Sequence, residues 1–488
     1  MILTLDIGTS VVKAAVWDED GLRARGSAAL VTEHPGPGRV EQDAGRWWPA
    51  VVEACRPCRL EEGAIEAAVL TGARQTLVPV DGGGEPLGPA LVWSDRRATA
   101  EAESLAGAVG GADAVRRATG AVLDGAAPAA KIAWLAAHEP QRLADSAWLA
   151  FPRDLVLHRL TGVVATDATM ASVSGMCDAE GRWVAGLTAA AGSRLPHVLA
   201  PDAVAGAVLA EAAGALGVRA GLPVVIGAGD RACEVLGAGA APDRPMVAWG
   251  TTANVSVPVG RRPAEPPAGV AVTRAADGGW LLEGGLSAAG SLLAWMGSLT
   301  GEPLEALLEK AQACPAGADG LIVLPWLGGA RAPWWQEGAG AAALGLHSRH
   351  GAPDLARAAV EGVAYDVARC LEAMAPALPG ALDGLAVGGS RATGRLWLEV
   401  VTAVTGLGAS RRRSGEAAMA GAALLAARAL GQAWSLDHLD PVDRRVEPDP
   451  DLVRRYGELR PLADEAAAAV IGVGRSDNRS GGEGVPGT

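Results

Sequence analysis

Short apolar runs interrupted by a Gly-Thr turn mark two distant parts of this chain. Residues 2–7 are mostly apolar, and the Gly-Thr-Ser sequence at 8–10 separates them from a second apolar stretch up to Trp17, which predicts two strands joined by a tight turn. A Gly-Thr-Thr sequence at 250–252 divides the apolar stretch 245–257 in the same way. Because no sequence repeat surrounds the two hairpins, we expect a duplication of structure rather than of residues.

Further apolar runs predict buried strands, and stretches rich in alanine and leucine at helical spacing predict helices. Strands are expected at 65–70, 89–93, 222–226, 279–283, 320–327 and 382–387, and helices over most of 100–165 and at 231–240, 287–300 and 352–375. A chain of 488 residues is too long for one compact core, so we expect two domains. The predicted division is 1–240 and 241–470, followed by a disordered tail at 471–488 that is rich in Gly, Ser, Asn and charge.

Composition and charge narrow the class of partner. The net charge of −13 argues against nucleic acid, because binding to a phosphate backbone requires clustered basic side chains. No run of about 18 apolar residues free of charge and glycine occurs, so no membrane span is expected. The first residues, MILTLDIGTS, lack the basic start of a signal peptide, which indicates a cytoplasmic protein.

The two Gly-Thr turns are candidate phosphate sites. Successive backbone N–H groups and hydroxyls in such a turn can form a nest for phosphate oxygens, so the turns at 8–10 and 250–252 can grip a polyphosphate from two sides. Asp6 lies two residues before the first turn on an apolar strand, where it is suited to hold Mg²⁺. Lys13, one of only three lysines, can neutralise phosphate charge. The ordinary alternatives are two plain turns and, for Lys13, a solvated strand residue.

Asp230 lies between the buried strand at 222–226 and a predicted helix. Local sequence supports two roles equally: an N-cap of that helix, or a carboxylate at a strand end that accepts a proton from a substrate hydroxyl. The Gly-Gly-Ser sequence at 388–390 lets a ligand lie close against the backbone, and an adenosine fits there in outline. Gly-Gly turns between a strand and a helix are also structurally common.

Nine motifs occur in the order in which the FGGY carbohydrate kinases carry them, and the chain resembles this family from about residue 2 to residue 465. They are DIGTSVVK at 6–13, VEQDAGRWW at 40–48, VWSDRRA at 92–98, GAGDRACEVLGAG at 227–239, WGTTANV at 249–255, LSAAGSLLAWM at 286–296, LPWLGGARAP at 324–333, LARAAVEGVAYDVA at 355–368 and VGGSRATGRLW at 387–397. The resemblance implies two ribonuclease-H-like α/β domains of the actin-like ATPase type, with ATP in the cleft between them. It also implies phosphorylation of a small sugar or polyol, with a homodimer common in the family.

The resemblance implies a role for each matching position. Asp230 matches the general base, which favours catalysis over helix capping, and Asp6 matches the carboxylate associated with the metal. The positions implied for ATP are Gly8, Thr9, Ser10, Lys13, Gly250, Thr251, Gly290, Gly389, Ser390 and Thr393.

The substrate positions depart from two groups within the family. Xylulokinases, which are closest in overall pattern, carry Met-His-Gly after the strand that corresponds to 65–70, whereas this chain has TGARQT at 71–76. That sequence is closer to the Arg-Glu-Thr of glycerol kinases, with Gln75 in place of the acid. Arg231 follows the base where both groups have Asn or Gln.

We therefore expect Arg74, Gln75, Asp230 and Arg231 to contact the substrate. Two arginines suit a substrate that is rich in hydroxyls or carries a carboxylate. The alternative is that one arginine points outward or pairs with Asp95 or Glu41. Kinases for a related polyol, aldonate or cyclitol, a member that binds ATP without sugar turnover, and a nucleotide-gated chaperone on the same fold also stay open.

Overall fold

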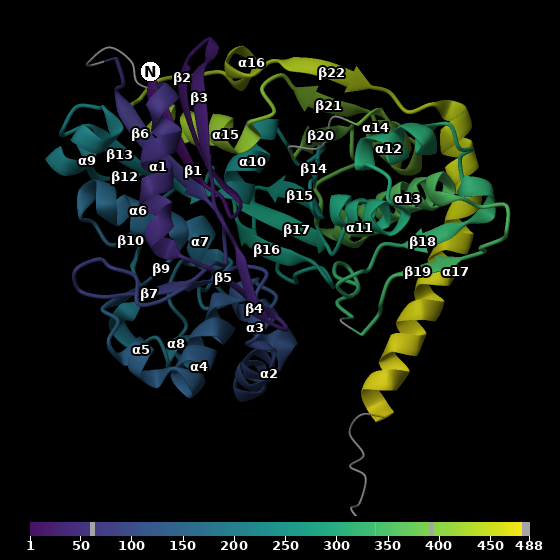
Figure 1. The fold of residues 1–488 in the computed structure, drawn as a ribbon, viewed down its shortest axis with the longest axis horizontal. Helices are drawn as coiled ribbons and strands as arrows, with labels where there is room; N and C mark the ends of the chain where they lie inside the picture. Colours follow the sequence, from purple (N-terminus) through teal and green to yellow (C-terminus); the bar gives the residue numbers. More distant parts are fainter. Residues whose placement is uncertain (59–63, 337, 390–393, 481–488) are drawn as a thin grey trace, which may run out of the picture.

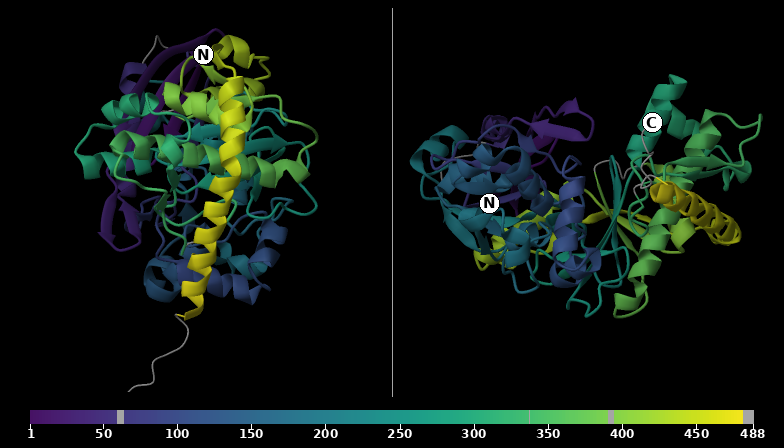
Figure 2. Two further views of the ribbon diagram at one scale, coloured as in Figure 1. Left: turned by 90° about the vertical axis from the view of Figure 1, so that its right-hand side faces the viewer. Right: turned by 90° about the horizontal axis from the view of Figure 1, so that it is seen from below.

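A computed structural model describes the chain except for residues 59–63, 337, 390–393 and 481–488, and it describes 474–480 by their backbone alone. The N-terminal and C-terminal halves form two lobes that lie side by side (Figure 1). Seen from below, the N terminus lies in the first lobe, and helix α17 (Pro450–Ser480) lies along the second (Figure 2). No helix among the described residues is long and apolar enough to cross a membrane.

A mixed sheet forms the centre of the N-terminal lobe, with the strand order β12-β13-β6-β1-β2-β3. Its strands are β1 (Ile2–Ile7), β2 (Val11–Asp18), β3 (Gly21–Ala29), β6 (Ala67–Gly72), β12 (Val204–Ala207) and β13 (Pro223–Gly229). β1 and β2 are the predicted hairpin, β6 is parallel to β1, and β13 is parallel to β6. The tight turn requires Gly8, because a Cβ there would lie 2.7 Å from the carbonyl oxygen of Val11.

A second mixed sheet forms the centre of the C-terminal lobe, with the order β16-β17-β15-β14-β20-β21-β22. Its strands are β14 (Met246–Trp249), β15 (Ala253–Val259), β16 (Ala271–Arg274), β17 (Trp280–Leu286), β20 (Leu385–Gly388), β21 (Ala409–Arg412) and β22 (Val442–Val446). β14 and β15 form an antiparallel hairpin, β20 is parallel to β14, and β21 is parallel to β20. The hairpin and the parallel strands thus repeat the first lobe, which confirms the predicted duplication.

Helices and small sheets surround the two central sheets. The helices are α1 (Trp47–Cys55), α2 (Thr99–Ala108), α3 (Ala112–Thr119), α4 (Pro128–His138), α5 (Pro140–Ala144), α6 (Pro152–Thr161), α7 (Ala168–Ser172), α8 (Ala185–Thr188), α9 (Ala210–Leu216), α10 (Asp230–Ala238), α11 (Gly290–Thr300), α12 (Leu304–Gln312), α13 (Ala352–Met374), α14 (Arg395–Thr405), α15 (Ala417–Ala429) and α16 (Leu436–Leu439). The remaining strands are β4 (Glu33–Gly36), β5 (Arg39–Gln42), β7 (Val78–Val80), β8 (Ala90–Leu91), β9 (Trp148–Ala150), β10 (Ala165–Asp167), β11 (His197–Leu199), β18 (Ile322–Leu324) and β19 (Ala342–Leu344).

Two helices, α10 and α15, join the lobes through direct backbone contact. A Cβ added to Gly237 of α10 would lie 1.8 Å from the carbonyl oxygen of Ala417, and one added to Gly421 of α15 would lie 2.0 Å from that of Cys233. Only glycine permits this approach. α10 ends at Ala238 and β14 begins eight residues later, on either side of the boundary predicted near residue 240.

The end of the described chain is helical. Helix α17 continues to Ser480, so the backbone is helical over 471–480, where a disordered tail was expected. An alanine-rich run at 466–469 favours this extension, because alanine has the highest helix propensity.

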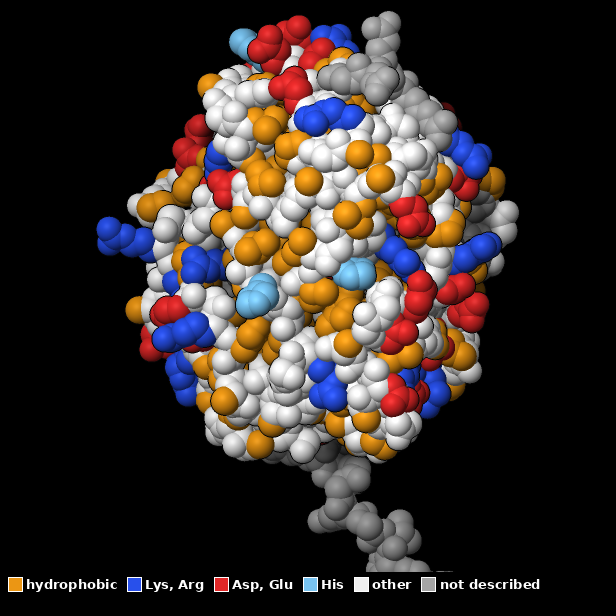
Figure 3. Space-filling view, turned by 90° about the vertical axis from the view of Figure 1, so that its left-hand side faces the viewer, with side chains coloured by type: hydrophobic (Ala, Val, Ile, Leu, Met, Phe, Trp, Pro, Cys, Tyr) orange, Lys and Arg blue, Asp and Glu red, His pale blue; other side chains and the backbone are white. Residues whose placement is uncertain are grey.

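On the face of the N-terminal lobe in Figure 3, side chains of both charge signs lie around the rim and the middle is largely uncharged.

Candidate active site

A cavity of about 260 Å³ lies between the two lobes and contains Asp230. The N-terminal lobe contributes Arg74, Gln75, Trp93, Asp230 and Arg231 to its wall, and the C-terminal lobe contributes Asn254, Thr273, Glu283, Arg331 and Trp335. All four residues that the sequence suggested for the substrate therefore line one cavity.

Asp230 is held at the end of a buried strand. β13 ends at Gly229, and Asp230 is the first residue of α10, so Gly229 rather than Asp230 is the N-cap. The backbone N–H of Arg231 donates to Asp230 Oδ1 at 2.6 Å, and 43% of the Asp230 side chain is exposed. Burial raises the pKa of Asp230, and the positive charges of Arg74 and Arg231 act against that increase.

Arg74 connects Asp230 to the other lobe. Its Nη1 and Nη2 atoms donate to the two carboxylate oxygens of Glu283 at 2.9 and 2.8 Å, and its Nε lies 3.6 Å from Asp230 Oδ1. The Arg74 side chain is 18% exposed and that of Glu283 is 6% exposed, so this bidentate pair is largely buried. Thr273 also donates to Glu283. The strongest polar contact of Arg74 thus crosses the interface between the lobes.

Arg231, the second arginine expected to contact the substrate, also forms an ion pair with a carboxylate. Arg231 Nη1 lies 2.5 Å from Glu234 Oε2, one turn along α10. Neither arginine pairs with Asp95 or Glu41; both of these carboxylates contact Arg97 instead, at 2.8 and 2.6 Å. The alternative based on those two partners is therefore wrong.

Gln75 has a φ of +63°, in the left-handed region that non-glycine residues rarely adopt. Gln75 lines the cavity next to Arg74 in the chain. Such backbone conformations persist where surrounding contacts hold them in place, and they are frequent at functional sites.

Asp6 and Lys13 lie opposite each other on the first hairpin, as neighbours in the β1–β2 register. Asp6 Oδ1 is buried and has no hydrogen-bond partner among the described residues. Burial first, and the charge of Asp230 second, raise the pKa of Asp6 to about 7, whereas Lys13 lowers it. Lys13 Nζ lies 2.7 Å from Glu416 Oε2, at the start of α15 in the other lobe.

The second Gly-Thr turn is tied to the start of α11. The N–H of Gly290 donates to the carbonyl of Gly250 at 3.0 Å, and the N–H of Ser291 donates to that of Thr251, also at 3.0 Å. Three residues that the resemblance implied for ATP, Gly250, Thr251 and Gly290, are therefore brought together.

Gly389, at the end of β20, has a φ of +90°, and a Cβ there would lie 2.5 Å from the carbonyl oxygen of Trp249. Glycine is thus required at this close approach to the second hairpin. Ser390 and Thr393, which were also expected to contact ATP, lie outside the described residues.

Two family models match the chain: the N-terminal domain of the FGGY family of carbohydrate kinases over residues 1–237, and its C-terminal domain over 246–430. The chain belongs to the FGGY family of carbohydrate kinases. As an FGGY kinase it phosphorylates a sugar or polyol with ATP. These matches confirm the predicted family and class of enzyme, and the crystal structure described next confirms the predicted fold.

Individual relatives are similar to this FGGY kinase over most of its length. It is 31% identical to a xylulose kinase of Streptomyces rubiginosus over 97% of this chain and 98% of that protein. It is 32% identical to a glycerol kinase of Rhodospirillum rubrum over 88% of this chain and 90% of that protein. The crystal structure of a ligand-bound xylulose kinase from Lactobacillus acidophilus has the same fold, with a TM-score of 0.89, 24% identity and coverage of 96% and 98%.

Sequence reasoning missed two acidic residues of this FGGY kinase, Glu283 and Glu416. Glu283 was detectable in principle, because it is the only charged residue of the apolar strand 280–286. Its partner was not detectable, because Arg74 lies 209 residues away in the chain. Glu416 lies in a Gly-Glu-Ala sequence that resembles an ordinary turn before a helix.

Proposed function

We propose that this kinase phosphorylates a hydroxyl of a small ketose or polyol, with Asp230 as the general base. The observation that carries the proposal is the position of Asp230 at a strand end, inside a cavity between the lobes, with Arg74 beside it. The relatives named xylulose kinase and glycerol kinase support a ketose or polyol as the substrate.

In the proposed reaction, Asp230 accepts the proton of the substrate hydroxyl as that oxygen bonds to the γ-phosphorus of ATP and the bond to ADP breaks. The base must be ionised to do so. Arg74 favours the ionised form, because its Nε lies 3.6 Å from Asp230 Oδ1.

The residues at the hairpins fit a metal and a nucleotide. The buried Asp6 Oδ1, which has no hydrogen-bond partner among the described residues, offers the kind of oxygen that Mg²⁺ binds. A Mg²⁺ ion there would neutralise charge on the phosphates. We assign phosphate binding to Lys13 and to the two Gly-Thr turns, and adenosine binding to the backbone near Gly389.

The pairing of Arg74 and Arg231 favours a neutral substrate rich in hydroxyls over one whose carboxylate would bind to either of them. Both arginines proposed to contact the substrate are already paired, Arg74 with Glu283 and Arg231 with Glu234. A substrate carboxylate would have to displace one of these acids and then lie close to Asp230, whose charge would repel it. Substrate hydroxyls can instead add hydrogen bonds to the remaining donors and acceptors.

A coupled assay of ATP consumption tests the proposal across pentuloses, hexuloses, polyols, aldonates and cyclitols. On the best acceptor, Asp230→Asn should reduce turnover by at least about 100-fold while ATP still binds. Asp277→Asn is the matched control, because Asp277 is an exposed acid in a turn of the other lobe. Near-normal turnover in Asp230→Asn would remove Asp230 from its proposed role.

A further inference from the structure

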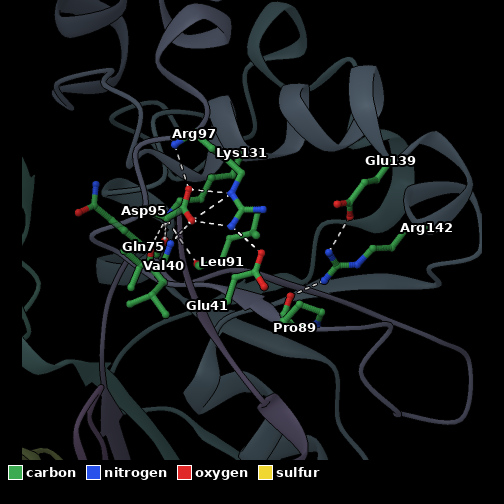
Figure 4. Close-up of polar contacts among 11 residues, drawn as sticks. Val40, Glu41, Gln75, Pro89, Leu91, Asp95, Arg97, Lys131, Glu139 and Arg142 are labelled. Atoms are coloured by element: carbon green, nitrogen blue, oxygen red, sulfur yellow. Dashed lines mark hydrogen bonds and ion pairs between the residues drawn. The ribbon is translucent and has the colours of Figure 1, made fainter. Parts of the chain in front are cut away.

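Lys131, on α4, is completely buried beside the substrate cavity. Figure 4 shows its ammonium group next to the backbone of Gln75 and of the segment around Leu91. Lys131 Nζ lies 2.8 Å from the carbonyl oxygen of Gln75, 2.8 Å from that of Val92 and 3.5 Å from that of Leu91. Its hydrogen bonds therefore go to backbone carbonyls of two separate segments.

Both segments form the wall of the cavity. Gln75 and Trp93 line it. The carbonyl of Gln75 itself accepts from Lys131, and so does that of Val92, which precedes Trp93 in the chain. A second link joins the same segments, because the N–H of Trp93 donates to Thr76 Oγ1 at 3.1 Å. The left-handed backbone at Gln75 lies at one end of this arrangement.

Burying an ammonium group lowers the stability of the fold, because the group loses its hydration. No carboxylate is hydrogen-bonded to Lys131 in the described structure: Asp95, the acid nearest to it in Figure 4, bonds to Arg97 and to the N–H of Val40. Burial lowers the pKa of Lys131 to about 7, and the negative charges of Asp95 and Asp124 act in the opposite direction. Apolar packing alone would not require an amine here, whereas the N–H groups of Lys131 can donate to the carbonyls of Gln75, Leu91 and Val92.

We propose that Lys131 is a positioning residue for the substrate. By holding the carbonyls of Gln75 and Val92, it fixes the backbone of two segments of the cavity wall, at Gln75 and next to Trp93. This inference rests on the proposed function, because it takes the cavity to be the substrate site. It assigns Lys131 no contact with ATP or with the reacting atoms.

The test replaces Lys131 by methionine, which is similar in length and apolar but has no N–H donors. Lys131→Met should raise the KM for the sugar or polyol about tenfold or more, because small displacements of positioning groups have large effects. The Kd for ATP should stay within about twofold of the wild type, because the nucleotide residues lie on other elements. Lys310→Met is the matched control, since Lys310 is an exposed lysine on α12.

A second variant keeps the inference testable if Lys131→Met does not fold. Thr76→Val removes the other link between the two segments and should raise the KM for the sugar in the same direction, again without changing the Kd for ATP. An unchanged KM for the sugar in Lys131→Met, or in Thr76→Val where only that variant folds, would overturn the inference. An equal weakening of sugar and ATP binding would overturn it too. If the wild type phosphorylated no acceptor in the screen, the proposed function would fail instead, before any variant was compared.

Discussion

The pair formed by Arg74 and Glu283 allows the proposed role of Asp230 to be tested by two substitutions with opposite effects. Burial raises the pKa of Asp230, and the positive charge of Arg74 lowers it. In Arg74→Met that charge is lost, so the pKa of Asp230 rises and the acid limb of kcat/KM moves to higher pH. In Glu283→Gln a negative charge is lost and Arg74 is released toward Asp230, so the limb moves to lower pH.

The magnitude follows from the distance. Two unit charges 3.6 Å apart, the separation of Arg74 Nε and Asp230 Oδ1, interact by about 5 kcal/mol at an effective dielectric constant of about 20 and by about 1 kcal/mol in bulk water. The lower value applies here, because 43% of the Asp230 side chain is exposed. An energy of about 1 kcal/mol changes the ionised fraction on the acid limb by about fivefold.

The assay is the pH dependence of kcat/KM for the best acceptor, with each profile normalised to its own plateau. Normalisation separates the ionisation of Asp230 from any loss of substrate contacts. At a fixed pH on the acid limb, Arg74→Met should fall about fivefold below the wild type and Glu283→Gln should lie above it.

The double variant Arg74→Met with Glu283→Gln is the control. Both members of the pair are neutral in it, so its acid limb should lie at higher pH than that of the wild type and no higher than that of Arg74→Met. It also avoids the unpaired buried carboxylate that Arg74→Met leaves at Glu283, which in other buried pairs destabilises by about 3–5 kcal/mol. Shifts of both single variants in the same direction would refute the reasoning.

Two further predictions concern the metal and the contact between the lobes. Asp6→Asn should raise the Mg²⁺ concentration needed for half-maximal turnover by about 10- to 100-fold at saturating ATP and sugar, as loss of residues around a metal commonly does; an unchanged Mg²⁺ titration would exclude Asp6 from the metal site. Gly421→Ala should destabilise the protein by about 1–3 kcal/mol, read as a lower thermal midpoint by circular dichroism, because small-to-large changes at packed positions do so. Its new Cβ would lie 2.0 Å from the carbonyl oxygen of Cys233. Gly457→Ala, on α17 with open space around it, is the control and should be neutral or stabilising; equal midpoints for the two variants would contradict the contact.

The sequence by itself determined the elements whose structure depends on local residue types. The two hairpins follow from apolar runs and Gly-Thr turns, and the order of nine motifs identified the family. Local sequence supported two roles for Asp230 equally, helix cap and general base, and the motifs around it favoured the base. The structure placed it at the first position of α10, with Gly229 as the cap.

Only the tertiary structure decided the partners of the charged residues in the cavity. Arg74 could be assigned to the substrate loop from sequence, but its bidentate contact with Glu283 exists because the two lobes meet there. Lys131 resembled any lysine on a helix until packing buried it against the carbonyls of Gln75 and Val92. Local patterns determine where a strand or helix forms, because backbone geometry repeats every two or 3.6 residues. Partners far apart in the chain depend on how those elements pack, and no local pattern records that.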